Sequence, residues 1–171
     1  AYLFLQNFIK MLRPGGRCGV VIKSTFLTAN DAASVLLRKQ LLTECELTEV
    51  LLLPKGVFSK TPATTVVLFF LKGTSTQDIW FYKLSSDRNF GQTNPLVEEH
   101  LSEFLSLQKN RPNTTNSWTI SVSNLNQETF ALPIRHPAAT FADEIISSAE
   151  LKRNLVELSS DTTKLLEKIG G

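Results

Sequence analysis

The stretch LTEVLLLPKGVFSKTPATTVVLFFLK, residues 47–72, contains two strongly apolar segments joined by a short loop. The first segment, Leu47–Leu53, is wholly aliphatic from Val50, and the second, Thr64–Leu71, is rich in β-branched and aromatic residues. Such segments are typical of strands that are largely buried, rather than of surface strands with alternating polarity. Because the loop is too short to hold a crossover helix, the sequence predicts that the second strand returns antiparallel to the first.

A helix and a strand precede this pair. Residues Tyr2–Leu12 place apolar side chains at helical spacing, and RPGGR (13–17) ends the helix because neither Pro nor Gly continues it. Gly19–Lys23 is a short apolar segment of the kind found in a central parallel strand. A second helix follows, with Thr28 or Asn30 as its capping residue. This alternation predicts a doubly wound α/β sheet, in which each helix crosses over to a parallel neighbouring strand.

The residues after the pair predict a smaller, mixed region and then a helical one. Ile79–Leu84 (IWFYKL) is expected to pair at an edge of the sheet. Leu96–Leu107 has the spacing of a helix, and Trp118–Val122 is a short strand. From Ala138 the pattern is helical again, and the leucine-rich stripe between Leu151 and Ile169 resembles a coiled-coil seam.

The composition excludes several classes of protein. The chain has 171 residues, of which 42% are hydrophobic and 20% charged, so it is long enough to bury a real core. A net charge of +2 is too small to indicate nucleic acid by itself. Cys18 and Cys45 form no CxxC pair, which fits a reducing compartment, and no apolar run is long enough for a membrane span. The sequence predicts a cytoplasmic location, and its start inside an amphipathic pattern is expected of a segment cut from a longer protein.

Four segments in succession resemble the modification (M) subunit of type I restriction-modification systems, in the C-terminal half of its methylase domain. They read FLQNFIKMLRPGGRCGVVIKSTFL, LRKQLL, LLLPKGVFSKTPATTVVLFFLKG and IWFYKL, and the resemblance is close over residues 3–84. It implies the Rossmann-like sheet of class I S-adenosylmethionine-dependent methyltransferases, ending in an antiparallel strand hairpin. Residues 1–84 are then the C-terminal part of the catalytic domain, 85–137 a mixed extension, and 138–171 a C-terminal helical region.

The resemblance also implies an activity, the transfer of a methyl group from S-adenosylmethionine to the exocyclic amine of adenine in DNA, with the target base flipped out. Two motifs that the family needs, the cofactor-binding FxGxG loop and the catalytic NPPF or NPPY motif, occur nowhere in residues 1–171. Asn94-Pro95-Leu96 lacks the second proline and the aromatic residue, so it is no substitute. No cofactor-binding residue is therefore expected in this segment, and the segment alone is predicted to be inactive.

Candidate site residues lie in the PKGVF-like loop. By resemblance, Phe58 packs against the flipped base; the alternative is that its ring caps the hydrophobic core at the end of the sheet. Lys55 and Lys60 are candidates for contacts with DNA phosphates, although loop lysines are usually only solvated. Thr61 and Thr64 either donate to phosphate or cap the returning strand.

No metal site is predicted, because His100 and His136 lack Cys or carboxylate partners at a ligand spacing. The partners that the resemblance implies are DNA, a specificity (S) subunit, a second M subunit and a restriction (R) subunit. The Leu151–Ile169 stripe has two open interpretations, a helix that packs within the chain and a contact with the S subunit.

Two classes of function stay open. The first is an enzyme fragment, part of a DNA adenine methyltransferase subunit. The second is a non-catalytic assembly or binding module that retains half of a methyltransferase-like sheet and docks through its C-terminal helices. An RNA or protein methyltransferase with the same sheet is the third and weakest, since the PKGVF loop resembles that of the DNA-modifying group most.

Overall fold

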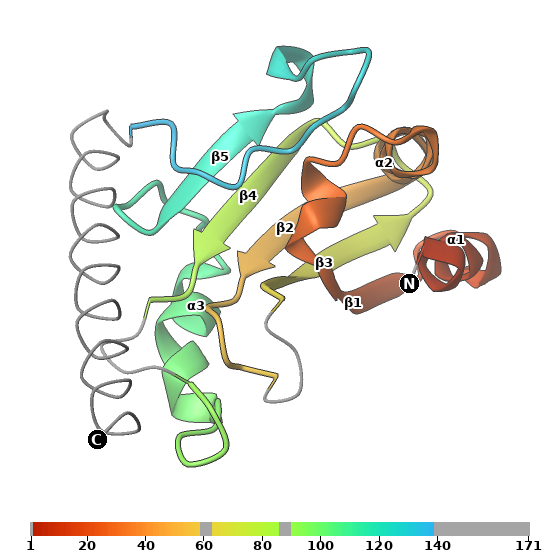
Figure 1. Ribbon diagram of the computed structural model, residues 1–171. Coiled ribbons are helices and arrows are strands. Elements are labelled where there is room, and N and C mark those ends of the chain that lie inside the picture. The colour runs from red at the N-terminus through yellow and green to blue at the C-terminus, as the bar shows by residue number, and fades with distance from the viewer. Residues whose placement is uncertain (1, 59–62, 86–89, 139–171) are drawn as a thin grey trace, which may run out of the picture. The chain divides into compact units, whose positions relative to one another are not determined.

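The computed structural model describes residues 2–58, 63–85 and 90–138. The chain divides into two compact units, residues 1–136 and 137–171, and the elements described below belong to the first. In chain order (Figure 1) they are α1 (Tyr2–Met11), β1 (Arg17–Lys23), η1 (Ser24–Leu27), α2 (Ala32–Glu44), β2 (Cys45–Leu52), β3 (Thr65–Lys72), β4 (Asp78–Lys83), η2 (Glu98–Leu101), α3 (Ser102–Leu107), β5 (Ser117–Ser121) and η3 (Val122–Asn124). The predicted helical region from Ala138 onward, with its leucine stripe, lies outside the described residues.

The five described strands form one sheet in the order β1-β3-β2-β4-β5. β3 lies between β1 and β2 and pairs antiparallel with both, so Leu68 is opposite Val20 on one side and Val50 on the other. β2 and β4 are parallel, and β5 returns antiparallel to β4. β3 thus has the antiparallel direction expected from its short connection to β2. It is inserted between β1 and β2, which run parallel to each other.

Two predictions about the sheet are wrong, and a third is not tested by the described residues. Among those residues β1 pairs only with the antiparallel β3, so the parallel neighbour expected for it is not one of them. β4 is not at an edge, because it lies between β2 and β5, with Trp80 and Phe81 buried. The sheet also does not end in the strand hairpin, since β4 and β5 continue it beyond β2. The common reason is that strand order depends on pairing between distant segments, which local patterns do not encode.

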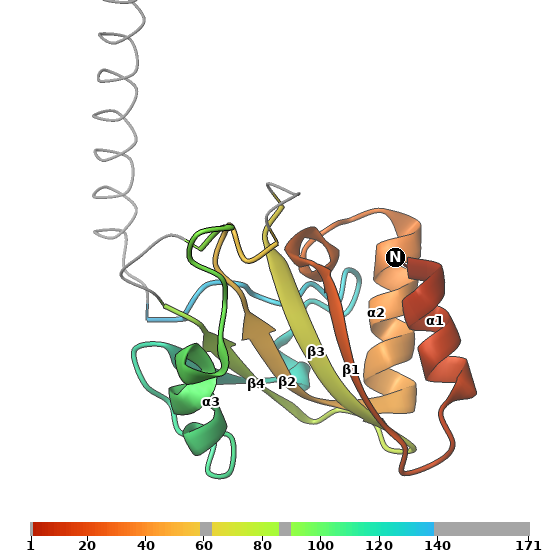
Figure 2. The ribbon, with the colours of Figure 1, turned by 90° about the horizontal axis from the view of Figure 1, so that it is seen from below.

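The alternation of side chains along β2 divides the core into two clusters, one on each face of the sheet. Val50 and Leu52 point to the face that α1 and α2 cover, whereas Leu51 and Leu53 point to the face where α3 packs. Figure 2 shows α1 and α2 side by side and α3 apart from them, near β4. Both faces of β2 are therefore covered, which confirms that its aliphatic run is a buried strand.

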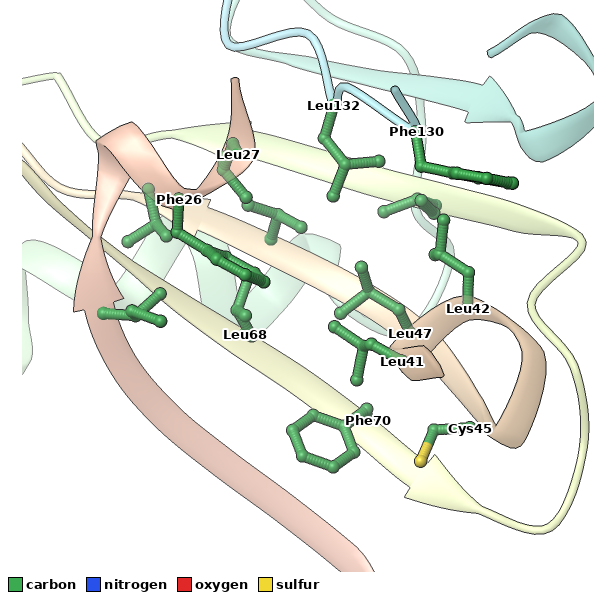
Figure 3. Close-up of a cluster of buried hydrophobic side chains, with 14 of the residues drawn as sticks. Phe26, Leu27, Leu41, Leu42, Cys45, Leu47, Leu68, Phe70, Phe130 and Leu132 are labelled. Carbon is green, nitrogen blue, oxygen red and sulfur yellow. The ribbon is translucent and has the colours of Figure 1, made fainter. Parts of the chain in front are cut away.

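The larger cluster contains residues from both ends of the described sequence (Figure 3). Phe26 and Leu27 of η1 lie close to Leu68 of β3, and the Leu132 side chain approaches from the segment after β5. The Leu132 amide donates to the Leu27 carbonyl over 2.8 Å. The extension after the sheet therefore closes the same core that the first helices and strands begin.

Arg38 of α2 is fully buried and joins the helix to two segments, residues 26–29 and 129–130. Its guanidinium donates to four backbone carbonyls, those of Phe26 (2.5 Å), Ala29 (2.7 Å), Thr129 (2.7 Å) and Phe130 (3.0 Å). Burial lowers the pKa of Arg38, an effect partly offset by a nearby carboxylate. A planar group with five donors suits this arrangement, because carbonyls from different directions are satisfied at once.

The N-cap of α2 is Asp31, and not Thr28 or Asn30 as the sequence predicted. The Asp31 carboxylate accepts hydrogen bonds from the backbone amide of Ser34 (2.9 Å) and from its hydroxyl (2.5 Å). These bonds lower the pKa of Asp31, since they favour its charged form. The cap lies further along the chain because Ser24–Leu27 forms a 3₁₀ turn first.

A buried carboxylate fixes the end of α3 against the sheet. Glu49 of β2 is 3% exposed, and its two oxygens accept from Gln108 (2.6 Å) and from Arg111 (2.7 Å), which follow the helix. A buried charge is tolerated when it is paired and hydrogen-bonded in this way. The contact joins the region after residue 84 to a strand of the predicted catalytic part.

Candidate functional site

The candidate site lies at the end of the strands, where β1 and β2 finish and β3 begins. The connection from β2 leaves this end after Leu53, whose amide donates to the Thr65 carbonyl over 3.0 Å. The Ser24 amide, just after β1, donates to the Thr64 carbonyl over 3.0 Å. Loops at strand ends are where α/β folds carry their chemistry, because the scaffold holds them while their side chains stay accessible.

The Thr64 side chain is hydrogen-bonded at the start of β3. Its hydroxyl lies 2.5 Å from the Ser24 hydroxyl, so the end of β1 and the start of β3 are joined by side chains as well as by backbone. This contact is compatible with the strand-capping interpretation of Thr64. Ser24 was not predicted from the sequence, because its partner is forty residues away in the chain.

Phe58 lies on the loop after β2 with its ring 43% exposed. It belongs to neither of the two buried clusters. Its predecessor Val57 is partly buried and packs against the cluster that contains Leu53 and Trp80. Neighbouring side chains of the loop therefore have different surroundings, with Val57 packed against the smaller cluster and the Phe58 ring partly exposed to solvent.

Gly56 gives the loop its shape. Its φ angle is +86°, a backbone conformation that residues with a side chain rarely adopt. A Cβ atom at this position would lie 2.0 Å from the carbonyl oxygen of Phe90. The loop backbone therefore lies directly against the segment between β4 and η2, and only glycine permits this approach.

The other predicted site residues divide into two groups. Lys55 is exposed in the same turn as Gly56, so the structure brings it together with Phe58 in one short loop. Lys60 and Thr61 lie outside the described residues. Phe90 was not predicted as part of this site, since its contact with Gly56 is made by a backbone carbonyl, which any residue type supplies.

The described part of the chain holds no grouping of three His, Cys, Asp or Glu side chains that could bind a metal ion. Within those same ranges, no helix has both the length and the apolar character needed to cross a membrane.

The chain matches a known protein family over most of its length. The family model described as N-6 DNA methylase matches residues 1–144. The methylase subunit of the type I restriction enzyme EcoKI, from Escherichia coli K12, is 36% identical over 111 residues, which are 59% of this chain and 21% of that protein. The EcoEI methylase subunit, also from Escherichia coli, is 30% identical over 148 residues, 80% of this chain and 30% of that protein. The chain thus spans less than a third of the length of these curated relatives.

Solved structures agree with the sequence matches. A chain from a structure of the type I restriction-modification system is 25% identical, with a TM-score of 0.73 over 98% of this chain and 39% of its own length. The modification subunit of a type I restriction enzyme from Vibrio vulnificus YJ016, described there as putative, is 28% identical, with a TM-score of 0.68 over 78% of this chain and 30% of its own. These matches confirm the resemblance stated from the sequence. The chain belongs to the N-6 DNA methylase family and is similar to the methylase subunits of type I restriction enzymes.

Proposed function

We propose that this chain is part of a DNA adenine methyltransferase subunit of a type I restriction-modification system, acting in the cytoplasm on the exocyclic amine of adenine in DNA. S-adenosylmethionine supplies the methyl group when bound, and we assign none of its binding residues to this chain. The observation that carries the proposal is the partly exposed ring of Phe58 on a loop that follows the carboxyl end of β2 and is held against the Phe90 carbonyl. An aromatic face in that place stacks on an extruded base whatever hydrogen-bond pattern the base presents.

Within this proposal, residues 1–84 form the C-terminal part of the catalytic domain. Two features support it. β1 has no described partner on its outer side, and Val21 on this strand is 50% exposed. On α1, Phe4 and Met11 are 68% and 82% exposed. We propose that the rest of the catalytic sheet, with the cofactor and catalytic motifs, pairs with β1 and covers α1. Residues 85–137 are the mixed extension, and 138–171 a helical region for subunit contacts.

Replacing Phe58 by alanine in the complete parent subunit is expected to lower methyl transfer to unmethylated DNA about tenfold, because base–aromatic stacking contributes about 1–3 kcal/mol. The thermal midpoint should change little, since the ring is not in the core. Phe58→Tyr retains an aromatic face and should retain most activity. The measurement is transfer of a labelled methyl group from S-adenosylmethionine, followed beside a melting curve.

Leu36→Ala is the matched control, since Leu36 is an exposed apolar residue on α2, 66% exposed. A large loss of stability with unchanged turnover in Phe58→Ala would instead show that the ring supports the core. The 171-residue chain by itself is expected to transfer no methyl group to DNA, and measurable transfer without added subunits contradicts that part of the proposal.

The exposed apolar residues on α1 are equally compatible with a second candidate, a non-catalytic assembly module. This module would use the half-sheet and the C-terminal helices only to dock other subunits. The same assay separates the two, because a module of this kind would leave its parent protein without methyl transfer, whether or not Phe58 is changed.

We further propose that residues 138–171 contact the S subunit, in an assembly that also contains DNA, a second M subunit and the R subunit. Removing residues 151–171 from the complete subunit is expected to lower the amount of S subunit that co-purifies with it by about tenfold or more, because the leucine stripe supplies the apolar surface for a helix–helix contact. Replacing Leu151, Leu155 and Leu158 by Ser is the milder test. Co-purification that stays at the level of the intact subunit would assign the stripe to packing within the chain.

A further inference from the structure

The segment between β4 and η2 touches the loop that carries Phe58. A Cβ atom added at Gly56 would lie 2.0 Å from the oxygen and 2.9 Å from the carbon of the Phe90 carbonyl. Cβ atoms essentially never approach other heavy atoms this closely, so the two backbones are in contact. Phe90 follows β4 in the chain, more than thirty residues after Gly56, and it nevertheless lies against the candidate site.

Phe90 is itself fixed by its own surroundings. Its side chain is only 6% exposed, and its ring meets the ring of His100 edge-to-face, with centroids 5.0 Å apart and an angle of 79°. The His100 ring accepts a hydrogen bond at Nδ1 from the Val97 amide over 3.1 Å. On the other side, the Gly91 amide donates to the Asn94 carbonyl over 3.0 Å. The Phe90 carbonyl is thus presented to Gly56 from a short, internally bonded segment.

The loop has one further anchor. Val57 packs against the cluster of Leu53, Trp80 and their neighbours, while Phe58 next to it is 43% exposed. An exposed ring has few contacts of its own, so its position is set by the backbone before it. That backbone is held on one side by Val57 and on the other by the Phe90 carbonyl.

We propose that Gly56 and Phe90 are positioning residues for the Phe58 ring, so that residues 90–100 of the extension set the geometry of base stacking. The inference rests on the proposed role of Phe58 and adds a device that holds it. Small displacements of a stacking group lower turnover strongly, since the reacting geometry is then reached less often.

The test is a set of glycine variants in the complete methylase subunit, assembled with its specificity subunit. Gly56→Ala should lower kcat for methyl transfer to unmethylated DNA severalfold, and by no more than Phe58→Ala does, while the KM for S-adenosylmethionine stays within twofold. Two controls separate the possible causes. Gly15→Ala carries the same type of positive φ (+76°) with nothing within 4 Å of its Cβ, and Gly91→Ala lies beside Phe90 in open space. Both should retain kcat within about twofold of the parent.

A double variant distinguishes positioning from general damage. If Gly56 acts through Phe58, Gly56→Ala combined with Phe58→Ala loses no more kcat than Phe58→Ala alone, whereas independent effects multiply. Multiplying losses, or an unchanged kcat in Gly56→Ala, overturn the inference and leave the role of Phe58 intact. An unchanged kcat in Phe58→Ala alone overturns the proposed function, and the inference with it. If Gly56→Ala does not fold, Phe90→Ala replaces it in the same cycle. This variant keeps the carbonyl but removes the buried ring that fixes the segment, so a loss of kcat is again expected, with the same overturning results.

Discussion

Replacing Arg38 by alanine is expected to lower the free energy of unfolding by at least about 3 kcal/mol, because four carbonyls in a buried region lose their donor at once. Each buried acceptor without a partner costs about 1–3 kcal/mol, and relaxation and water recover part of the sum. The loss should appear in urea unfolding of the chain, followed by tryptophan fluorescence.

Arg38→Lys tests whether charge or shape matters. A lysine keeps the positive charge but presents one compact ammonium group, which does not span carbonyls from two separate segments. It is expected to destabilise the chain nearly as much as alanine does. Arg13→Ala, an exposed arginine in the turn after α1, should change stability by less than about 0.5 kcal/mol. A stability of Arg38→Ala close to that of Arg13→Ala would contradict the assignment of Arg38 as the residue that joins these segments.

Replacing Phe104 by alanine is expected to cost about 3–5 kcal/mol, the usual range for removing a buried aromatic side chain. Phe104 is 3% exposed, and its ring packs against three others, those of Phe69 (6.0 Å), Trp80 (5.8 Å) and Tyr82 (5.5 Å between centroids). Removing it leaves a cavity between α3 and the sheet. Burial, with a hydrogen bond to Glu103, raises the pKa of Tyr82.

The neighbouring Leu105 provides the control. It is 47% exposed on the same short helix, so Leu105→Ala should change stability by less than about 0.5 kcal/mol. The measurement is again urea unfolding, where Trp80 reports directly on the loss of its stacked partner. If Phe104→Ala and Leu105→Ala have equal stabilities, α3 does not contribute to the fold through this contact.

Local patterns predicted which segments are strands and which of them are buried. The aliphatic run in β2 has no polar alternation, and the structure covers both of its faces. The same patterns did not predict strand neighbours. The segment IWFYKL, which forms β4, has the pattern of an edge strand. Its second partner, β5, is a short segment that follows a polar linker, and no local pattern marks the two strands as neighbours.

For the candidate site, the sequence predicted the loop and its aromatic residue but not what holds them. Phe58 was found because an apolar ring between two buried strands is unusual in a loop. The contacts of Gly56 and of Arg38 were not predicted, because their partners are backbone carbonyls, and every residue type has the same carbonyl group. Arg38 in particular lies within LRKQ, a run that reads as the solvated side of a helix.

The insertion of β3 between β1 and β2 has a consequence for synthesis on the ribosome. β1 and β2 make no direct ladder with each other, and each pairs with β3 along nearly its whole length. The sheet therefore stays incomplete until Lys72 has left the exit tunnel, and until then both earlier strands present unpaired edges. The joining of β1 to β2 waits for β3, so a stall before residue 65 leaves these two strands without their shared partner.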